Sequence, residues 1–311
     1  MATPFSCSSS KWDQRAIPER GAAFFERWQT TRISNPRPLA EKSRSHDVFD
    51  GPFATISGRG GFGPVPGIRF RNLTLGYDDH PAVHHLEGEI APGSLTAVIG
   101  PNGSGKSTLI KGIVGQLSPL EGLIEISGPE RCGIAYLPQQ AAIDRTFPIS
   151  VFDLVALGLW CEIGSIRGLT AKQRGRVIEA LSAVGLDGLE RRPITTLSGG
   201  QLQRALFARV LLQNSRLILL DEPFTAIDAK TSADLMALIE RWHGEARTII
   251  AVLHDIELVK ERFPQAMMLA RTTVAWGETR EVLTASNLLK ARAMSESWTE
   301  DAPWCRRRGA T

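Results

Sequence analysis

The segment Gly100–Thr108 reads GPNGSGKST and has the residue types and spacing of a loop that binds phosphate groups. Its glycines let backbone N–H groups turn toward phosphate oxygens without a clash from a Cβ atom. Lys106 supplies a positive charge for the β- and γ-phosphates, and the hydroxyl of Ser107 is a ligand for Mg²⁺. We therefore expect a bound nucleotide with Mg²⁺, contacted by Gly100, Asn102, Gly103, Gly105, Lys106, Ser107 and Thr108.

Two carboxylates end a second apolar segment, Leu217–Glu222. A buried strand that ends in aspartate beside a phosphate loop holds Mg²⁺, so we assign this role to Asp221. Glu222 is then placed to polarise the attacking water as a general base. The alternative is an ordinary acidic residue at a helix start before Pro223, and the phosphate loop makes that alternative the weaker one.

A third segment, Leu197–Gln201, reads LSGGQ at the start of a predicted helix. Ser198 and Gln201 have the spacing of a capping box, which explains them as local structure. The glycines between them, Gly199 and Gly200, also leave a bare helix N-terminus where the helix dipole favours a phosphate group. The motif therefore predicts a capped helix and a second anion site.

Three single residues complete the set. They are Gln139 in Tyr-Leu-Pro-Gln, Asp228 in Thr-Ala-Ile-Asp, and His254 after a predicted strand. Each is a weak indication alone, since a lone histidine after a strand is more often structural than catalytic. Their order along the chain, rather than any one of them, points to a shared site.

Buried strands and helices must position these residues. Leu95–Ile99 is an apolar run typical of a strand, and Ser107–Gln116 reads as the helix that follows the phosphate loop. Leu217–Leu220 and Thr248–Leu253 are two more buried strands, separated by a predicted helix at Thr231–Trp242. This βαβ pattern predicts an α/β fold with a parallel sheet at its core.

Outer elements are expected on either side of this core. Ile68 and Phe70 alternate with polar residues, and Val83–Ile90 reads as a second strand, so a small antiparallel layer should precede the phosphate loop. A late strand at Thr272–Trp276 and a closing helix at Thr284–Met294 should follow the core.

A long segment between the core strands, Ser150–Leu186, is predicted to be mostly helical. Thr170 and Gln173 form a capping-box pattern within it. The helix that starts at LSGGQ should run to about Gln213.

Composition limits the remaining possibilities. The chain has 311 residues with 42% hydrophobic residues, no apolar run of membrane-spanning length and no secretory signal. Residues 1–65 account for the whole net charge of +3, so no basic surface indicates a nucleic-acid partner. The cysteines fit neither a metal site nor a disulfide framework: Cys7, Cys132, Cys161 and Cys305.

The N-terminal segment has a different character from the rest of the chain. Residues 1–56 lack a sustained period and are predicted to be disordered. Residues 57–67 form a Gly/Pro linker, and translation is hypothesised to start near Val65.

In the order GPNGSGKST, LPQ, LSGGQ, LILLDE, TAID and VLHD, the motifs resemble the ATP-binding subunit of an ABC transporter. The resemblance covers about residues 68–287, and other P-loop proteins lack LSGGQ. It implies the P-loop NTPase fold of an ABC nucleotide-binding domain: a parallel sheet core, an antiparallel β layer and a helical subdomain at about residues 140–200. The ATPase domain would then span residues 68–287, with a helix end and tail at residues 288–311.

The resemblance also implies roles around the ATP. Tyr77 resembles the aromatic residue that stacks on adenine, and Gln139 the residue that senses Mg²⁺ and the attacking water. His254 resembles the residue that contacts the γ-phosphate. The catalytic set of Glu222, His254 and Gln139 matches the family pattern, so ATP hydrolysis is expected.

Other roles implied by the family lie between subunits. Ser198 and Gly200, with Gly199 and Gln201 beside them, resemble the signature contacts to ATP held by the other subunit. Asp228 resembles a residue at the interface of a head-to-tail homodimer. A chain of this family needs a separate integral-membrane permease, so we expect a peripheral location at the cytoplasmic face of the inner (plasma) membrane. The expected docking surface follows Gln139 and includes Phe147, Phe152 and Leu157.

The substrate is inferred by likeness alone. Residues 134–160 resemble ATPases that import zinc or manganese, which receive metal indirectly from a periplasmic binding protein. Arg145-Thr146 replaces the Trp-Asp pair of many manganese-type members, which favours zinc. The sequence segments around Tyr77 and His254 resemble those of zinc importer ATPases of the Azt type.

Alternatives remain. They are import of manganese or of iron chelates, a soluble ABC ATPase that acts on DNA or ribosomes, and an inactive binding module. A single cassette, and 92 residues from Lys106 to Ser198 without heptads or CxxC, disfavour the soluble class. Intact Glu222 and His254 disfavour the inactive module.

A His/Asp-rich patch surrounds the expected adenine site. A metal site there is disfavoured, because zinc needs three or four convergent ligands and Pro81 argues against a helix that would align the histidines. An exposed turn is the favoured interpretation of Asp78, Asp79, His80, His84 and His85.

Overall fold

The computed structural model describes residues 65–77, 80–127, 133–164, 168–225 and 227–296. The predictions for residues 1–56, for most of the linker, for Asp78 and Asp79 and for the C-terminal tail lie outside these ranges. Within them, no helix is long and apolar enough to cross a membrane.

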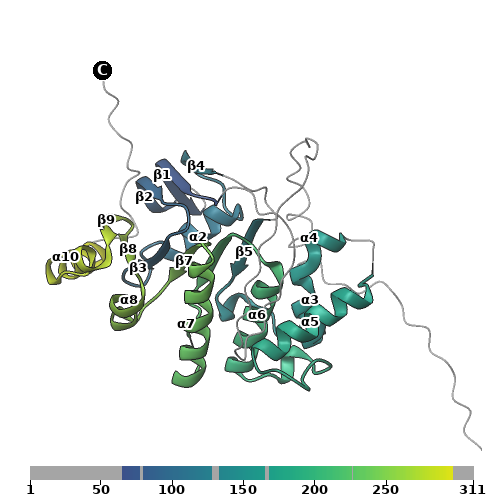
Figure 1. Ribbon diagram of the computed structural model, residues 1–311. Helices are drawn as coiled ribbons and strands as arrows, with labels where there is room; N and C mark the ends of the chain where they lie inside the picture. The colour runs from purple at the N-terminus through teal and green to yellow at the C-terminus, as the bar shows by residue number, and fades with distance from the viewer. Residues whose placement is uncertain (1–64, 78–79, 128–132, 165–167, 226, 297–311) are drawn as a thin grey trace, which may run out of the picture. The chain divides into compact units, whose positions relative to one another are not determined.

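The main sheet has six strands in the order β5-β6-β7-β3-β8-β9. Five are parallel, and β9 runs antiparallel to β8 (Figure 1). The phosphate loop, the two carboxylates and His254 follow the carboxyl ends of β3, β6 and β7, so they meet at one edge of the sheet. The strands are β3 (Leu95–Ile99), β5 (Ile134–Leu137), β6 (Leu217–Asp221), β7 (Thr248–Val252), β8 (Gln265–Ala270) and β9 (Thr272–Glu278).

The central strands are buried on both faces, which explains their continuous apolar runs. Side chains alternate along each strand, so Ile218 and Leu220 belong to one core cluster and Leu217 and Leu219 to another. The first cluster includes residues of α6, α7 and α8, and the second includes α2 and the smaller sheet. These helices are α2 (Lys106–Val114), α6 (Gly199–Gln213), α7 (Ala229–Gly244) and α8 (Ile256–Arg262).

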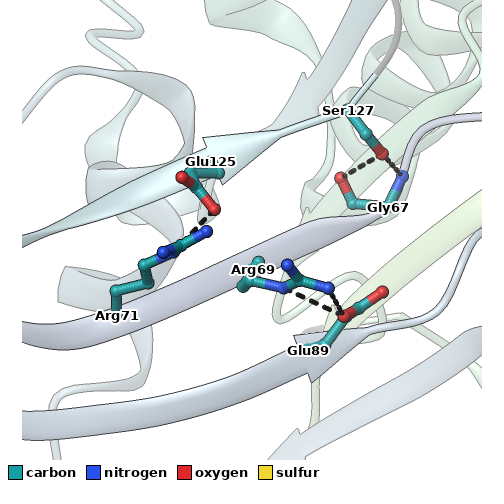
Figure 2. Close-up of polar contacts among 6 residues, drawn as sticks. All are labelled: Gly67, Arg69, Arg71, Glu89, Glu125 and Ser127. Carbon is teal, nitrogen blue, oxygen red and sulfur yellow. Dashed lines mark hydrogen bonds and ion pairs between the residues drawn. The ribbon is translucent and has the colours of Figure 1, made fainter.

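The smaller sheet is antiparallel, in the order β2-β1-β4. One row of side chains, including Phe70, is buried in the core. On the exposed side Arg69 pairs with Glu89 at 2.7 Å and Arg71 with Glu125 at 2.9 Å (Figure 2). Its strands are β1 (Ile68–Tyr77), β2 (His80–Ile90) and β4 (Glu121–Ile126).

The segment between β5 and β6 is mainly helical, and Figure 1 shows α3, α4, α5 and α6 gathered beside β5. Both predicted capping boxes are confirmed, at Thr170 with Gln173 and at Ser198 with Gln201. The short helices are η2 (Gln140–Ala142), α3 (Val151–Ala156), η3 (Leu157–Leu159), α4 (Trp160–Ile163), α5 (Ala171–Ala183) and η4 (Ile194–Thr196).

Most predicted core elements are confirmed, while β4, β5 and β8 were not predicted. β4 is mostly exposed and β5 has four residues, so neither gives a clear period. At the end of the chain, α9 (Thr279–Val282) precedes the expected closing helix α10 (Ala285–Glu296).

Two details differ from expectation. Helix α2 ends at Val114, two residues before the predicted Gln116, because Gly115 takes a left-handed conformation with φ 81° and caps the helix. Cys161 is disulfide-bonded, so the expectation that the cysteines form no disulfide is wrong for this residue.

Candidate functional site

The phosphate loop connects β3 to α2 in a conformation that requires glycine. Gly105 has φ 94°, and a Cβ atom there would lie 2.5 Å from the carbonyl oxygen of Ala82. Gly100 has φ 151°, and a Cβ atom there would overlap the carbonyl oxygen of Leu269. The loop is therefore packed tightly against neighbouring backbone from behind, and its shape is fixed.

Lys106 lies inside this loop with only 6% of its surface exposed. Its Nζ donates hydrogen bonds to the carbonyl oxygens of Gly100 at 2.9 Å and Pro101 at 2.8 Å. Burial lowers the pKa of Lys106, and the nearby carboxylates of Glu222 and Asp221 oppose that shift. The ammonium group is thus held at the centre of the loop by acceptors that compete with phosphate oxygens.

Ser107 and Asp221 form the pair expected of a Mg²⁺ site. The Ser107 hydroxyl donates to Asp221 Oδ1 at 3.1 Å, across 114 residues of sequence. Asp221 ends β6 with 1% of its surface exposed, and this burial raises its pKa although the Ser107 hydrogen bond lowers it. A hydroxyl and a carboxylate are hard oxygen ligands, so the donor set fits Mg²⁺.

Glu222 is held by three side chains from different parts of the chain. Gln139 Nε2 donates to Glu222 Oε2 at 2.8 Å, and His254 Nε2 lies 2.8 Å from Glu222 Oε1. Thr225 adds a hydroxyl at 3.3 Å. Burial favours a higher pKa for Glu222, but the hydrogen bonds from His254, Gln139 and Thr225 outweigh it and hold the pKa below its usual value. The carboxylate is therefore ionised and oriented.

The backbone at Glu222 is also unusual, with φ 51° in the left-handed region. Its N–H donates to the carbonyl oxygen of Val252 at 3.2 Å, which fixes the turn at the end of β6. A left-handed non-glycine residue costs about 1–3 kcal/mol, and among the described residues Glu222 is the one of this kind that lines the pocket.

Most of these residues line one pocket of about 540 Å³, whereas Gly100, Asp221 and Thr225 do not line it. Of the predicted site residues, it joins most of the phosphate loop to Gln139, Glu222 and His254. Its lining also includes Ala82 and Ser104, which the sequence did not indicate. The full lining is Ala82, Asn102, Gly103, Ser104, Gly105, Lys106, Ser107, Thr108, Gln139, Glu222 and His254.

The signature segment Ser198–Gln201 and Asp228 do not line this pocket. Ser198 and Gln201 bond to each other across the first turn of α6, and Asp228 caps α7 through Thr231. Tyr77 also stands apart, with 45% of its surface exposed and its hydroxyl accepting a hydrogen bond from Lys111 at 3.2 Å.

The described histidines do not form a metal site. Among the described residues, no group of three or more His, Cys, Asp or Glu side chains is arranged to hold a metal ion. His84 is 5% exposed, and burial lowers its pKa. His85 Nδ1 lies 3.0 Å from Asn72 Oδ1. His84 thus lies in the protein interior and His85 is half-buried, and all three histidines belong to strand β2, so the prediction of an exposed turn is wrong for them, although His80 is exposed.

Sequence reasoning missed four residues around the site: Gln140, Gln203, Arg204 and Thr225. Gln203 and Arg204 follow LSGGQ in α6 and bond to the segment after Glu222 or to the cap of α7. The only signal was a polar pair in a largely apolar helix, which is too common to indicate a contact.

A glycine-rich phosphate loop between β3 and α2, with Ser107 and Asp221 side by side, defines a P-loop ATPase. Residues 83–225 match the ABC transporter family. The manganese transport system ATP-binding protein MntB of Listeria monocytogenes is 36% identical over 225 residues, which is 71% of this chain and 94% of the relative. The chain therefore belongs to the ATP-binding proteins of ABC transporters.

Other relatives agree on the family and differ in the metal that they are named for. The zinc transport system ATP-binding protein TroB of Treponema pallidum is 36% identical, over 72% of this chain and 86% of its own. A solved structure described as an inward-facing metal-chelate type ABC transporter is 29% identical with a TM-score of 0.65, over 73% of this chain and 89% of that chain. A dimeric ATP-binding cassette bound to ADP and Pi is 26% identical with a TM-score of 0.62, over 68% and 99%.

Proposed function

We propose that this chain is the ATP-hydrolysing subunit of an ABC importer for a divalent metal. The observation that carries the proposal is the pocket that joins the phosphate loop to an oriented carboxylate, Glu222, with Asp221 bonded to the Ser107 that lines it. Such a pocket has the groups needed to bind ATP and to activate water.

Each group has a distinct part in hydrolysis. The phosphate loop and Lys106 bind the β- and γ-phosphates, and Glu222 accepts the proton of the attacking water. Gln139 and His254 keep Glu222 ionised and oriented, and both line the pocket that would hold the γ-phosphate and the attacking water. Mg²⁺, bound by Ser107 and Asp221 with Gln139 nearby, would neutralise charge that develops on the phosphates.

A second copy of the chain completes the site. The signature residues Ser198, Gly199, Gly200 and Gln201 do not line the pocket of their own chain. In a head-to-tail homodimer they would face the ATP of the partner, and Asp228 would lie at the interface. The dimeric relative bound to ADP and Pi supports this arrangement.

An integral-membrane permease is the second proposed partner. Phe147 is 58% exposed and Leu157 36% exposed, as a docking surface after Gln139 requires. Phe152 packs against the core, so it supports that surface from below. We propose a peripheral position on the cytoplasmic face of the inner membrane, with residues 68–287 as the ATPase domain and a helical subdomain at about residues 140–200.

The metal is proposed to be zinc, with manganese as the second candidate. Arg145-Thr146 and the Azt-type segments favour zinc, while relatives named for manganese transport favour manganese. The metal would be delivered by a periplasmic binding protein. An iron chelate is the third possibility, supported by the structural likeness to a metal-chelate type transporter.

Reconstitution with the permease in proteoliposomes tests the proposal. ATPase activity should rise when zinc-loaded binding protein is added, and Zn²⁺ should be taken up. Stimulation by manganese-loaded protein alone would transfer the proposal to manganese. ATPase activity that neither metal nor an iron chelate changes would contradict the transport function, and the absence of any ATPase activity would contradict the site.

A further inference from the structure

A buried glutamine links the signature helix to the catalytic segment. Gln203, with 1% of its surface exposed, lies one turn after Gly199 in α6. Its Nε2 donates to the carbonyl oxygen of Pro223 at 2.7 Å, directly after Glu222. Its Oε1 accepts a hydrogen bond from Gln140 Nε2 at 3.0 Å. Both polar atoms of the Gln203 amide are therefore hydrogen-bonded, which fixes the orientation of the amide.

Gln140 extends this link toward the start of the signature helix. Its Nε2 also donates to the carbonyl oxygen of Gly199 at 2.8 Å. The preceding residue, Gln139, bonds to Glu222. Two adjacent glutamines thus contact the catalytic carboxylate and the signature helix, and Gln203 closes the ring through Pro223.

The next residue, Arg204, fastens the far end of the same segment. Its guanidinium donates to Thr231 Oγ1, and the Thr231 hydroxyl in turn donates to Asp228 Oδ2 at 2.7 Å. Asp228 caps the N-terminus of α7, because its Oδ1 accepts a hydrogen bond from the backbone N–H of Thr231 at 2.9 Å. Two consecutive residues of α6 therefore bond to Pro223, directly after Glu222, and to Thr231, in the first turn of α7.

The polarity of these links distinguishes positioning from packing. An apolar side chain at position 203 would fill the same space and avoid the cost of burying an amide. Gln203 instead makes one hydrogen bond to the Pro223 carbonyl and one to the Gln140 side chain, and such directional bonds fix the distance between elements, which apolar contacts do not. Gln203 and Arg204 therefore set the register of α6 against the segment between Glu222 and Asp228.

We propose that Gln203 and Arg204 are positioning residues that couple the signature helix to the catalytic segment of the same chain. A displacement of the signature surface by the partner's ATP then reaches Glu222 through Pro223 and reaches Asp228 through Thr231. Because the coupling acts on ATP hydrolysis, it rests on the proposed function.

Gln203→Met tests the coupling, because it keeps the volume and removes both hydrogen bonds. Gln213→Met is the matched control, with the same substitution in the last turn of the same helix and a side chain that makes no hydrogen bond among the described residues. We expect Gln203→Met to lower kcat about tenfold or more with the KM for ATP within about twofold, since small misplacement of catalytic groups acts on kcat. Gln213→Met should keep the wild-type kcat.

A double-variant cycle excludes a merely structural effect. Gln140→Leu leaves the Pro223 bond in place, so its loss of kcat should be smaller than that of Gln203→Met. The loss of kcat in the variant with both substitutions should be smaller than the two single losses combined, because the Gln140–Gln203 bond is removed by either substitution, while the Gln140–Gly199 bond is removed only by Gln140→Leu. Arg204→Leu should weaken the ATP-dependent dimer of the Glu222→Gln background, and Arg204→Lys should restore part of it.

The outcomes separate the coupling from the proposed function. If the wild type and Gln213→Met hydrolyse no ATP, the proposed function fails. If they hydrolyse ATP and Gln203→Met stays within twofold of the wild-type kcat, the coupling is wrong. Additive losses in the double variant, or equal losses in Gln203→Met and Gln213→Met, would also overturn it.

Discussion

The polar side chains of the pocket and those of the signature segment find their hydrogen-bond partners in different ways. In the pocket, three side-chain bonds join residues that are far apart in the sequence: Ser107 to Asp221, Gln139 to Glu222, and Glu222 to His254. In the signature segment, the Ser198 side chain bonds to Gln201 within one helical turn, and the longer link from Gln140 goes to a backbone carbonyl, that of Gly199. The pocket is assembled by the fold of one chain, whereas the signature segment is organised locally and is left facing outward.

Burial explains the difference. Asp221 and Lys106 are almost fully buried, and a buried charge without a partner is expensive, so the fold must supply partners for both. The residues of the signature segment are exposed or half-buried and can be hydrated. A locally satisfied, accessible helix start can receive a ligand from outside the chain without breaking the fold.

Removal of the base should give the largest effect on the pocket. In Glu222→Gln the amide still accepts from Gln139, but it cannot take a proton, so kcat should fall by about 100-fold or more. The affinity for ATP should be retained, because the phosphate loop is unchanged. Phosphate release and equilibrium binding of a fluorescent ATP analogue measure the two quantities. Turnover at the wild-type rate would remove Glu222 from its role and leave the pocket without a base.

Mixing two inactive variants tests whether the signature segment serves another chain. Lys106→Ala disables the phosphate loop and Ser198→Arg blocks the signature surface. Half of the dimers in an equal mixture are mixed and each has one intact composite site, so activity should recover to about a quarter of the wild-type value. Each variant alone should be inactive, and ATPase assays on the separate and mixed proteins measure this.

Loss of the helix cap needs its own control in that experiment. Ser198→Arg removes an N-cap, which costs about 1 kcal/mol of stability. Its melting temperature should therefore be compared with that of Ser198→Ala, which also loses the cap but adds no bulk. A mixture that stays inactive while both variants are folded would refute the shared site.

The difference between local and long-range contacts also explains which features could be predicted from the sequence. The phosphate loop, the base and the capping box at Ser198 were predicted because each is encoded within a few adjacent residues. The Gln203–Pro223 link was not, because neither residue has a pattern and the contact depends on how α6 packs against the end of β6. The strand β8 was missed for a related reason, since it is placed in the sheet by parallel pairing with β3, which lies more than 160 residues earlier in the chain.

A milder change in the pocket should shift a pH profile. The hydrogen bonds that lower the pKa of Glu222 include the one from Thr225. A lowered pKa keeps the base ionised at pH values above it, so activity is lost only when the pH falls through that value. Thr225→Val removes one donor, so the acidic limb of kcat should move to higher pH.

The direction of that shift is the decisive result, and kcat measured between pH 4 and 7 at saturating ATP provides it. Thr196→Val is a suitable control, because the Thr196 hydroxyl bonds to the carbonyl of Pro193, away from the pocket. An acidic limb that stays in place in Thr225→Val, or moves to lower pH, would show that Glu222 does not govern it.

An ion pair on the outer face of the smaller sheet tests whether burial or distance along the sequence decides how much a pair contributes to stability. Arg71 and Glu125 are 54 residues apart, like the pocket pairs, but both side chains are about half exposed, like the signature segment (Figure 2). If burial decides what a pair contributes, Arg71→Ala should lower the free energy of unfolding by about 0.5 kcal/mol or less, because water and salt screen exposed charges. Arg247 is the buried counterpart, bonding to Glu245 and to the carbonyl oxygen of Ser215, and Arg247→Met should cost about 2 kcal/mol or more. Urea denaturation of both variants measures the difference, and an Arg71 loss as large as the Arg247 loss would mean that distance along the chain, and not burial, separates the two regions.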